Sequence, residues 1–113
     1  MHIDYTRGDQ LPIEFPLVDD GGNKLLPTDI DEITMTCRKE PYISSEIIFE
    51  KRFTRGEIEY NEADEVYVVK MQTGDTKKCD YETYGYDIEV KMGEIVDTTA
   101  GTIKIGVEYT MEG

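Results

Sequence analysis

The feature that most constrains the fold is a strict alternation of apolar and polar residues in four stretches of the chain. In the clearest one, Tyr84–Met92, every second residue is apolar and the residues between are glycine or charged. Successive side chains of a β-strand point to opposite faces, so a period of two predicts one buried and one solvent-facing face. The other three stretches, Gln10–Leu17, Glu32–Arg38 and Thr102–Tyr109, are predicted strands by the same rule. The side chains expected to face the core are Tyr84, Tyr86, Ile88, Val90, Met92, Ile103, Ile105, Val107, Tyr109, Leu11, Ile13, Phe15, Leu17, Ile33, Met35 and Cys37.

Further strands and turns complete the pattern, at a spacing of about ten residues that is typical of all-β domains. The remaining strands are expected at His2–Thr6, Glu46–Phe53, Glu57–Tyr60 and Val66–Met71, with a short locally paired piece at Lys24–Leu26. The connections are expected to be a tight turn at Arg7–Asp9, a glycine turn at Asp19–Asn23, a helical turn at Pro27–Glu32 capped by Thr28 or Asp29, a short helix or turn at Gly74–Lys78, and hairpin ends at Arg55-Gly56 and Gly93-Glu94.

Two prolines, Pro12 and Pro16, lie on the polar face of the predicted strand Gln10–Leu17. Proline has no amide hydrogen to donate to a strand ladder, so this strand is predicted to be an edge strand or to be bulged. An edge strand can form protein contacts by strand addition, and the prolines would limit which neighbours pair with it.

The fold class follows from the strands and from the lack of long helices. No segment has a 3.6-residue period over the length that a parallel crossover requires. We therefore expect an all-β fold, an immunoglobulin-like two-sheet antiparallel β-sandwich of about seven or eight strands. A closed barrel is the alternative. The 113 residues fit one domain, 1–113.

The charge of the chain limits its partners. There are 25 acidic and 12 basic residues, for a net charge of −13. Such a surface repels phosphate backbones and anionic lipids, so we expect neither nucleic acid nor a membrane as a partner. No apolar run approaches the roughly 18 residues that cross a bilayer. The start, Met1–Tyr5, has no secretory signal pattern, which predicts synthesis in the cytoplasm.

The sequence contains no recognisable set of catalytic residues. The one histidine is His2, and neither Ser44 nor Ser45 has a base nearby in sequence. We expect no enzymatic activity, and we assign no catalytic, cofactor-binding or metal-binding residue. Cys37 is expected in the core and Cys79 in a polar turn or short helix. A disulfide between them stays open, and the zinc-type C-x-x-C motif is absent.

A second class of function, a carbohydrate- or calcium-dependent binding module, also remains open. Tyr42, Tyr60 and Tyr67 could stack on sugars if their rings face solvent. Calcium prefers clustered oxygen ligands. The acidic turns offer such ligands at Asp19, Asp20, Asn23, Asp29, Asp31 and Glu32.

Several segments, each a strand or a turn, resemble in their order and spacing the N-terminal domain of the phage baseplate upper protein and related small tail or prophage β-sandwich proteins. These segments are Tyr5–Asp9, Leu11–Leu17, Val18–Asn23, Ile33–Lys39, Tyr84–Val90 and Gly101–Val107. The resemblance implies a non-enzymatic structural protein of a phage or prophage, associated with the tail or baseplate and located in the virion. Its implied partners are other phage structural proteins, with further copies of itself as a second option. The segments Glu40–Ser45 and Asn61–Glu65 depart from the pattern, as does the lack of an attachment region after the last strand.

Overall fold

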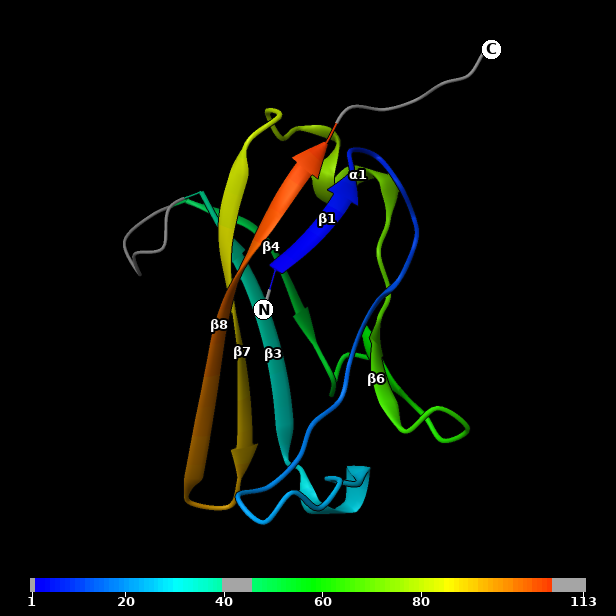
Figure 1. Cartoon of the computed structure of the whole chain (residues 1–113), viewed down its shortest axis with the longest axis vertical. Coiled ribbons are helices and arrows are strands. Elements are labelled where there is room, and N and C mark those ends of the chain that lie inside the picture. Colours follow the sequence, from blue (N-terminus) through cyan, green and yellow to red (C-terminus); the bar gives the residue numbers. More distant parts are fainter. Residues whose placement is uncertain (1, 40–45, 107–113) are drawn as a thin grey trace.

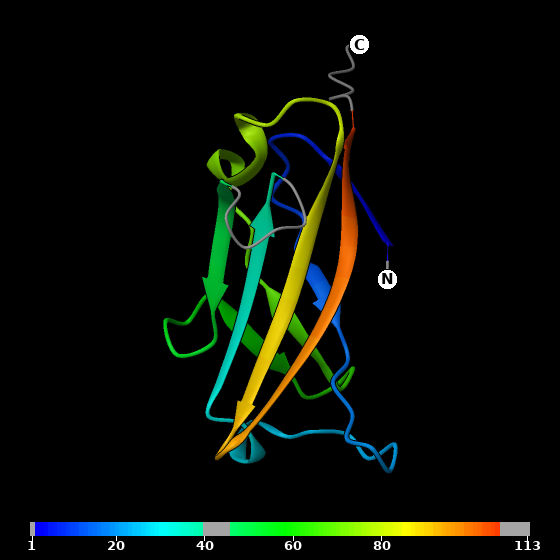
Figure 2. The ribbon, with the colours of Figure 1, turned by 90° about the vertical axis from the view of Figure 1, so that its left-hand side faces the viewer.

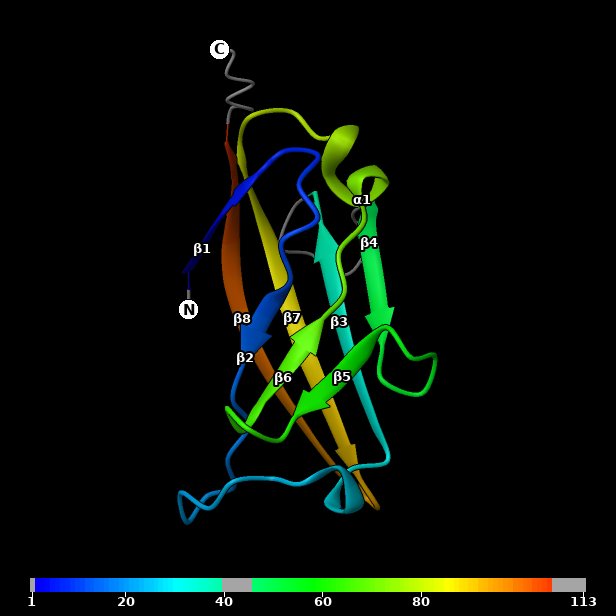
Figure 3. The same cartoon turned by 90° about the vertical axis from the view of Figure 1, so that its right-hand side faces the viewer.

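The computed structural model describes residues 2–39 and 46–106, and these form two β-sheets that pack face to face (Figures 1, 2 and 3). The five-stranded sheet has the order β1-β8-β7-β3-β4 and the three-stranded sheet has the order β2-β6-β5. The strands are β1 (His2–Thr6), β2 (Ile13–Phe15), β3 (Glu32–Arg38), β4 (Ile47–Arg52), β5 (Ile58–Asn61), β6 (Val66–Val69), β7 (Thr83–Met92) and β8 (Ile95–Gly106). The helical segments are η1 (Pro27–Asp29) and α1 (Thr73–Lys77). The predicted all-β, two-sheet sandwich is confirmed at this level.

The core lies between the two sheets, where the alternating strands direct their apolar side chains. Ile33 and Met35 on β3 are 0% exposed, and β7 contributes every second residue from Tyr84 to Val90. Burial of such side chains is the main stabilising contribution to a domain of this kind. The buried apolar side chains are Tyr5, Ile13, Phe15, Ile30, Ile33, Met35, Cys37, Ile48, Phe49, Ile58, Tyr67, Val69, Met71, Cys79, Tyr84, Tyr86, Ile88, Val90, Ile103 and Ile105.

Buried tyrosine hydroxyls donate to backbone carbonyls, as their chemistry requires. The Tyr5 hydroxyl donates to the Leu11 carbonyl at 2.6 Å, and the Tyr67 hydroxyl donates to the Leu25 carbonyl at 2.8 Å. These bonds attach the irregular segments on either side of β2 to the sheets.

The longest hairpin joins β7 to β8 through the predicted turn Gly93-Glu94. Gly93 has φ +61°, and Met92 pairs with Ile95 directly across the turn. A glycine with positive φ at the first position of a two-residue turn matches the twist of the flanking strands. β8 begins at Ile95, well before the predicted start at Thr102. The additional segment, Ile95–Ala100, is exposed on both faces, so it has no apolar alternation to reveal it.

The expectation of a fully antiparallel sandwich is wrong for one pair. β1 pairs with β8 in parallel, with His2 opposite Thr102 and Thr6 opposite Gly106. These strands lie near opposite ends of the sequence, so no tight turn fixes their relative direction. Alternation reports which face of a strand is buried and contains no information about the direction of its neighbour.

The strand predicted at Gln10–Leu17 is also shorter than expected. β2 has 3 residues, Ile13–Phe15, and lies between Pro12 and Pro16 at the edge of its sheet. The prolines remove donors on both sides, which ends the ladder. Leu11, predicted to face the core, is 64% exposed because it precedes the strand.

Several turns differ in detail from their predictions. Arg55-Gly56 is a turn, but it joins β4 to β5 in different sheets and is therefore not a hairpin end. The N-cap of η1 is Leu26, whose amide donates a hydrogen bond to the Asp29 carboxylate at 3.0 Å, and not Thr28 or Asp29 as predicted. Lys24 pairs with Val18 in a single bridge. The predicted inward residues Val107 and Tyr109 lie outside the described residues.

Candidate functional site: an open strand edge

The first half of β8 presents an open backbone edge. β1 pairs only with Thr102–Gly106, whereas β7 pairs with the other side of β8 along its length. Among residues 2–39 and 46–106, no strand pairs with the edge of Ile95–Gly101 that points away from β7. The lower part of β8 is therefore the rim of the five-stranded sheet (Figure 1). Ile95 is 64% exposed and Val96 is 54% exposed.

The direction of the backbone groups along this edge follows from two hydrogen bonds. The Ile105 amide donates to the Glu82 carbonyl, next to β7, at 3.0 Å, and the Gly106 carbonyl accepts from the Arg7 amide, next to β1, at 3.2 Å. Amide and carbonyl groups of successive strand residues point to alternate sides, and the β7–β8 pairing has no register shift. Hence Val96, Thr98 and Ala100 direct their N–H and C=O groups away from β7, toward the open edge.

The edges formed by β2 and β4 are shielded. β2 is shielded by Pro12 and Pro16, and β4 carries Lys51 on its inner face, opposite Met35 of β3. Prolines and inward-pointing charges are common devices that prevent edge-to-edge pairing. The open half of β8 contains no proline, and its one charged residue, Asp97, lies on the inner face but is exposed, so this edge is less protected than those of β2 and β4.

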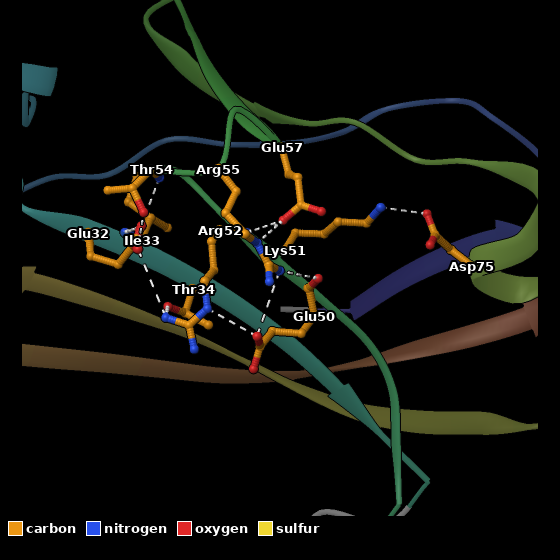
Figure 4. A network of polar contacts seen from close by, with 10 residues as sticks. All are labelled: Glu32, Ile33, Thr34, Glu50, Lys51, Arg52, Thr54, Arg55, Glu57 and Asp75. Atoms are coloured by element: carbon orange, nitrogen blue, oxygen red, sulfur yellow. Dashed lines mark hydrogen bonds and ion pairs between the residues drawn. The ribbon is translucent and has the colours of Figure 1, made fainter.

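The inward lysine of β4 is neutralised by the short helix that follows β6. The Lys51 ammonium lies 2.7 Å from the Asp75 carboxylate, and these side chains are 7% and 19% exposed (Figure 4). The same Asp75 carboxylate accepts the Gln72 amide at 2.7 Å at the start of α1. A charge at this depth requires a partner, and Asp75 supplies it.

The outer face of β4 carries a separate network of charges (Figure 4). Arg52 lies between Glu50, at 3.0 Å, and Glu32, at 3.9 Å. Its guanidinium also donates to the Thr34 hydroxyl at 3.5 Å, which helps to explain why Thr34 is buried on the outer face of a sheet. Arg55 contacts Glu50 and Glu57 at the end of the strand. This network stabilises the edge of β4 and leaves few groups there for a partner.

The acidic turn considered for calcium has a local structural role. Asp19 accepts the amides of Gly21 and Asn23, each at 2.9 Å. Hydrogen bonding from the Asn23 amide lowers the pKa of Asp19, with further contributions from the Asn23 side chain and the Gly21 amide. Asp20 is exposed beside this turn. These bonds account for the turn as an Asx-type structure.

The second acidic group also serves the backbone. The Asp29 carboxylate accepts a hydrogen bond from the Leu26 amide at the start of η1, and the Asp31 carboxylate accepts one from the Gly93 amide at 2.6 Å. Glu32 accepts the Thr54 hydroxyl at 2.5 Å and the amides of Ile33 and Thr54, each at 3.0 Å. Burial opposes ionisation of Glu32, but these hydrogen bonds and Arg52 outweigh it and lower the pKa of that carboxyl. In the described ranges no group of three or more His, Cys, Asp or Glu side chains could hold a metal ion.

The tyrosines considered for sugar stacking lie in different environments. Tyr67 is 1% exposed, with its ring between those of Phe15, Phe53 and Tyr60, so it offers no stacking face. Tyr60 is half-buried, and Tyr42 lies outside the described residues. Tyr60 lines a shallow hollow together with Leu26, Pro27, Thr28, Glu62, Ala63 and Glu65.

The two cysteine thiols are buried, and the ring of His2 contacts neighbouring polar groups. Cys37 and Cys79 are both free and buried, and Cys79 lies just after the short helix α1. Burial, followed by the proximity of Cys79, raises the pKa of the Cys37 thiol to about 12, so this thiol is a weak nucleophile. His2 contacts the Thr102 hydroxyl at 2.7 Å and Asp4 at 3.1 Å. Ser44 and Ser45 lie outside the described residues.

Comparison with known proteins adds no assignment. No model of a protein family matches the sequence, and no characterised protein gives a significant match. Within residues 2–39 and 46–106, no helix has the length and apolar character to cross a membrane. The resemblance to phage baseplate and tail proteins therefore remains a prediction from the sequence.

Sequence reasoning missed the two features that distinguish the sheet edges. The open segment Ile95–Gly101 lacks alternation, but its β-branched residues Ile95, Val96, Thr98 and Thr99 follow a glycine turn and are typical of strands. Lys51 takes an inward position between Phe49 and Phe53, where a strict alternation would place an apolar residue. A charged residue at that position was the available signal.

Proposed function

We propose that this protein is a non-enzymatic structural component of a phage or prophage, associated with the tail or baseplate, which acts through protein–protein contacts in the virion. The single observation that carries the proposal is the open backbone edge at Ile95–Gly101. A strand edge with unpaired N–H and C=O groups is a template for pairing with another chain. The resemblance in strand and turn segments supplies the phage context and an immunoglobulin-like strand arrangement.

The distribution of polar chemistry supports an assembly role over ligand binding. The carboxylates of Asp19, Asp29, Asp31 and Glu32 accept backbone amides. The most buried charged pair, Lys51 with Asp75, connects β4 to α1. Charged groups that organise turns and edges serve a rigid scaffold, which is what an assembly component requires.

The test is whether the protein is part of a particle. Phage particles from cells that carry this gene would be purified on a density gradient, and their proteins quantified by mass spectrometry. We expect this protein in the particle fraction at a fixed ratio to the tail proteins. An abundant soluble cytoplasmic enzyme serves as the carry-over control. Recovery of the protein only in the unbound fraction, like that control, would refute the proposal.

The adhesive alternative has one supporting observation, the half-buried ring of Tyr60 beside Glu62 and Glu65. An aromatic ring next to carboxylates is a common platform for a sugar. Thermal unfolding with and without calcium, or with a panel of oligosaccharides, tests it. An assembly component keeps the same midpoint under all these conditions, whereas a rise with ligand concentration would favour the binding module.

A further inference from the structure

We infer that the open edge of β8 pairs with the same edge of a second copy, giving a two-fold symmetric dimer in which the five-stranded sheets of both copies are continuous. The proposed assembly function supplies the biological role of this dimer. Most soluble homo-oligomers use such closed two-fold interfaces, in which the same surface of both copies is self-complementary.

The direction of the free backbone groups restricts the register of this pairing. An antiparallel pair needs residues that both face the partner, and on this edge those are Val96, Thr98 and Ala100. The two-fold axis must therefore pass through a residue. An axis through Asp97 or Thr99 would also align these groups, but the first would set two Asp97 side chains opposite each other and the second would bring Val96 onto Thr102, which β1 already occupies. An axis between two consecutive residues would set a group that faces the partner against one that faces β7.

The extent of the open edge then selects one axis. An axis at Ala100 would bring Thr98 of one copy onto Thr102 of the other, which β1 already occupies. An axis at Val96 would use only the first residues of the strand, next to the turn. An axis at Thr98 pairs Ile95 with Gly101 and so uses the open edge from the turn to the start of β1. In that register Val96 of each copy lies opposite Ala100 of the other copy, and Thr98 lies opposite Thr98 of the other copy. Each of these three pairs exchanges two hydrogen bonds.

The side chains are compatible with the same register. On the outer face Val96 meets Ala100, and Thr98 meets Thr98 of the other copy, a favourable type of cross-strand pair. On the inner face Asp97 meets Thr99, so no like charges lie directly opposite each other. The next residues along the outer row are on β7, where Lys91 adjoins Val96 and Asp87 adjoins Ala100. Each Val96–Ala100 pair is thus flanked by a lysine of one copy and an aspartate of the other.

The net charge of the chain opposes this dimer and predicts how its affinity depends on salt concentration. Each copy has a net charge of −13, so two copies repel at low ionic strength. Salt screens this repulsion over a Debye length of about 8 Å at physiological ionic strength. Dimerisation should therefore strengthen as salt is added. A dimer held mainly by exposed ion pairs would weaken instead.

Sedimentation analysis of the full chain from about 1 μM to about 1 mM, the range of weak complexes, tests the inference. We expect a concentration-dependent monomer–dimer equilibrium. Thr98→Glu would place two glutamates opposite each other at the axis, beside Glu89 of each copy. We expect this variant to raise the dissociation constant on the order of tenfold or more. Thr98 is exposed, so this variant should stay folded, with a thermal unfolding midpoint lowered only slightly by the like charge of Glu89.

Rescue by a complementary variant identifies the axis. Thr98→Lys mixed with Thr98→Glu should form a heterodimer tighter than the Thr98→Glu homodimer, because lysine then faces glutamate. Thr98→Lys alone is the weaker disruptor because Glu89 adjoins it on β7. Thr83→Glu, at another exposed strand threonine that lies on β7 outside the proposed interface, is the control and should leave the equilibrium unchanged.

A wild-type protein that stays monomeric to about 1 mM in added salt would overturn the inference, as would a dimer that Thr98→Glu does not weaken. These outcomes are distinct from failure of the proposed function. If the protein is monomeric but still enters phage particles, the proposed assembly function stands and the open edge binds a different protein. A dimer absent from particles would retain the pairing and remove the role.

Discussion

Lys51, on the inner face of the edge strand β4, contacts Asp75 of α1, with 2.7 Å between its ammonium and the carboxylate. Lys51 lies on β4, at the edge of the five-stranded sheet, and Asp75 lies on α1, which follows β6 of the three-stranded sheet. Their ion pair therefore fixes the short helix against the edge of the five-stranded sheet. α1 has 5 residues, too few for stability as an isolated helix. Its position therefore depends on this contact and on the burial of Thr76.

Removal of the negative partner should be strongly destabilising. Asp75→Asn leaves the Lys51 ammonium buried without a counter-charge, and we expect a loss of about 3 kcal/mol in the free energy of unfolding. Lys51→Met should cost less, because it removes the buried charge itself. Urea denaturation of both single variants and the double variant measures the coupling.

The exposed pair of Lys70 with Glu59 provides the control for that experiment. These side chains are 53% and 61% exposed, and water screens their attraction. Lys70→Met should change the stability by less than about 1 kcal/mol. Equal effects of Asp75→Asn and Lys70→Met would show that the ion pair of Lys51 with Asp75 does not hold α1 in place.

Acid should destabilise the protein through Glu32. Its pKa is lowered in the folded state, so the stabilisation is complete above the ordinary value of 4.5 and is lost as pH falls through the lower folded value. Thr54→Val removes the hydrogen bond of the Thr54 hydroxyl and should reduce this loss. Stability measured by urea titration at several pH values below neutrality would check it; an identical pH profile in wild type and Thr54→Val would contradict the assignment.

Alkali should destabilise the protein through Tyr67. Burial, followed by Tyr60 and Asp29, raises the pKa of Tyr67 to about 12 from the ordinary 10.0. A raised folded pKa gives stability that is complete below pH 10 and is lost as pH rises toward 12. Tyr67→Phe should cost about 1 kcal/mol at neutral pH, because the Leu25 carbonyl loses its donor, and should flatten the alkaline profile.

Tyr81→Phe, at an exposed tyrosine, is the control for the alkaline series. Tyr5, Tyr84 and Tyr86 also have raised pKa values through burial, so part of the alkaline sensitivity should persist in Tyr67→Phe. An alkaline profile that Tyr81→Phe flattens as much as Tyr67→Phe does would place the titration elsewhere.

Gly93 should be difficult to replace. Its φ of +61° suits glycine, and Gly93→Ala should cost about 1 kcal/mol. Gly74, within α1, has no positive φ and has open space around its Cα, so Gly74→Ala should stabilise the protein by about 0.5 kcal/mol. Opposite signs for these two substitutions in thermal unfolding are the expected result; two losses of similar size would contradict the turn conformation.

The sequence predicts the buried parts of this fold well, because burial imposes a period of two. β3 and β1 have their predicted bounds, and β7 begins one residue early at Thr83. The inward residues from Tyr84 to Val90 are all buried. Turn chemistry at Gly93-Glu94 and the helical segment near Gly74 are also predicted, because glycine and capping residues act locally.

The parts that the sequence predicts poorly are those where burial or local chemistry gives no signal. Ile95–Gly101 has two exposed faces, so its strand is visible only through its partner β7. The parallel direction of β1 against β8 depends on the path of the whole chain. Lys51 occupies a core position only because Asp75, distant in sequence, supplies a counter-charge. The candidate interaction edge was missed because it lies in Ile95–Gly101, where exposure of both faces leaves no alternation in the sequence.

The proposed function depends on protein contacts at the open edge of β8. Residue-resolved amide hydrogen exchange, measured by NMR on dilute and concentrated protein, tests it most directly. In dilute protein, exchange should be fast at Val96, Thr98 and Ala100, which face the edge, and slow at Asp97 and Thr99, which face β7. In concentrated protein we predict selective protection of the first three amides. Unchanged exchange at those amides, with protection elsewhere or nowhere, would contradict the account.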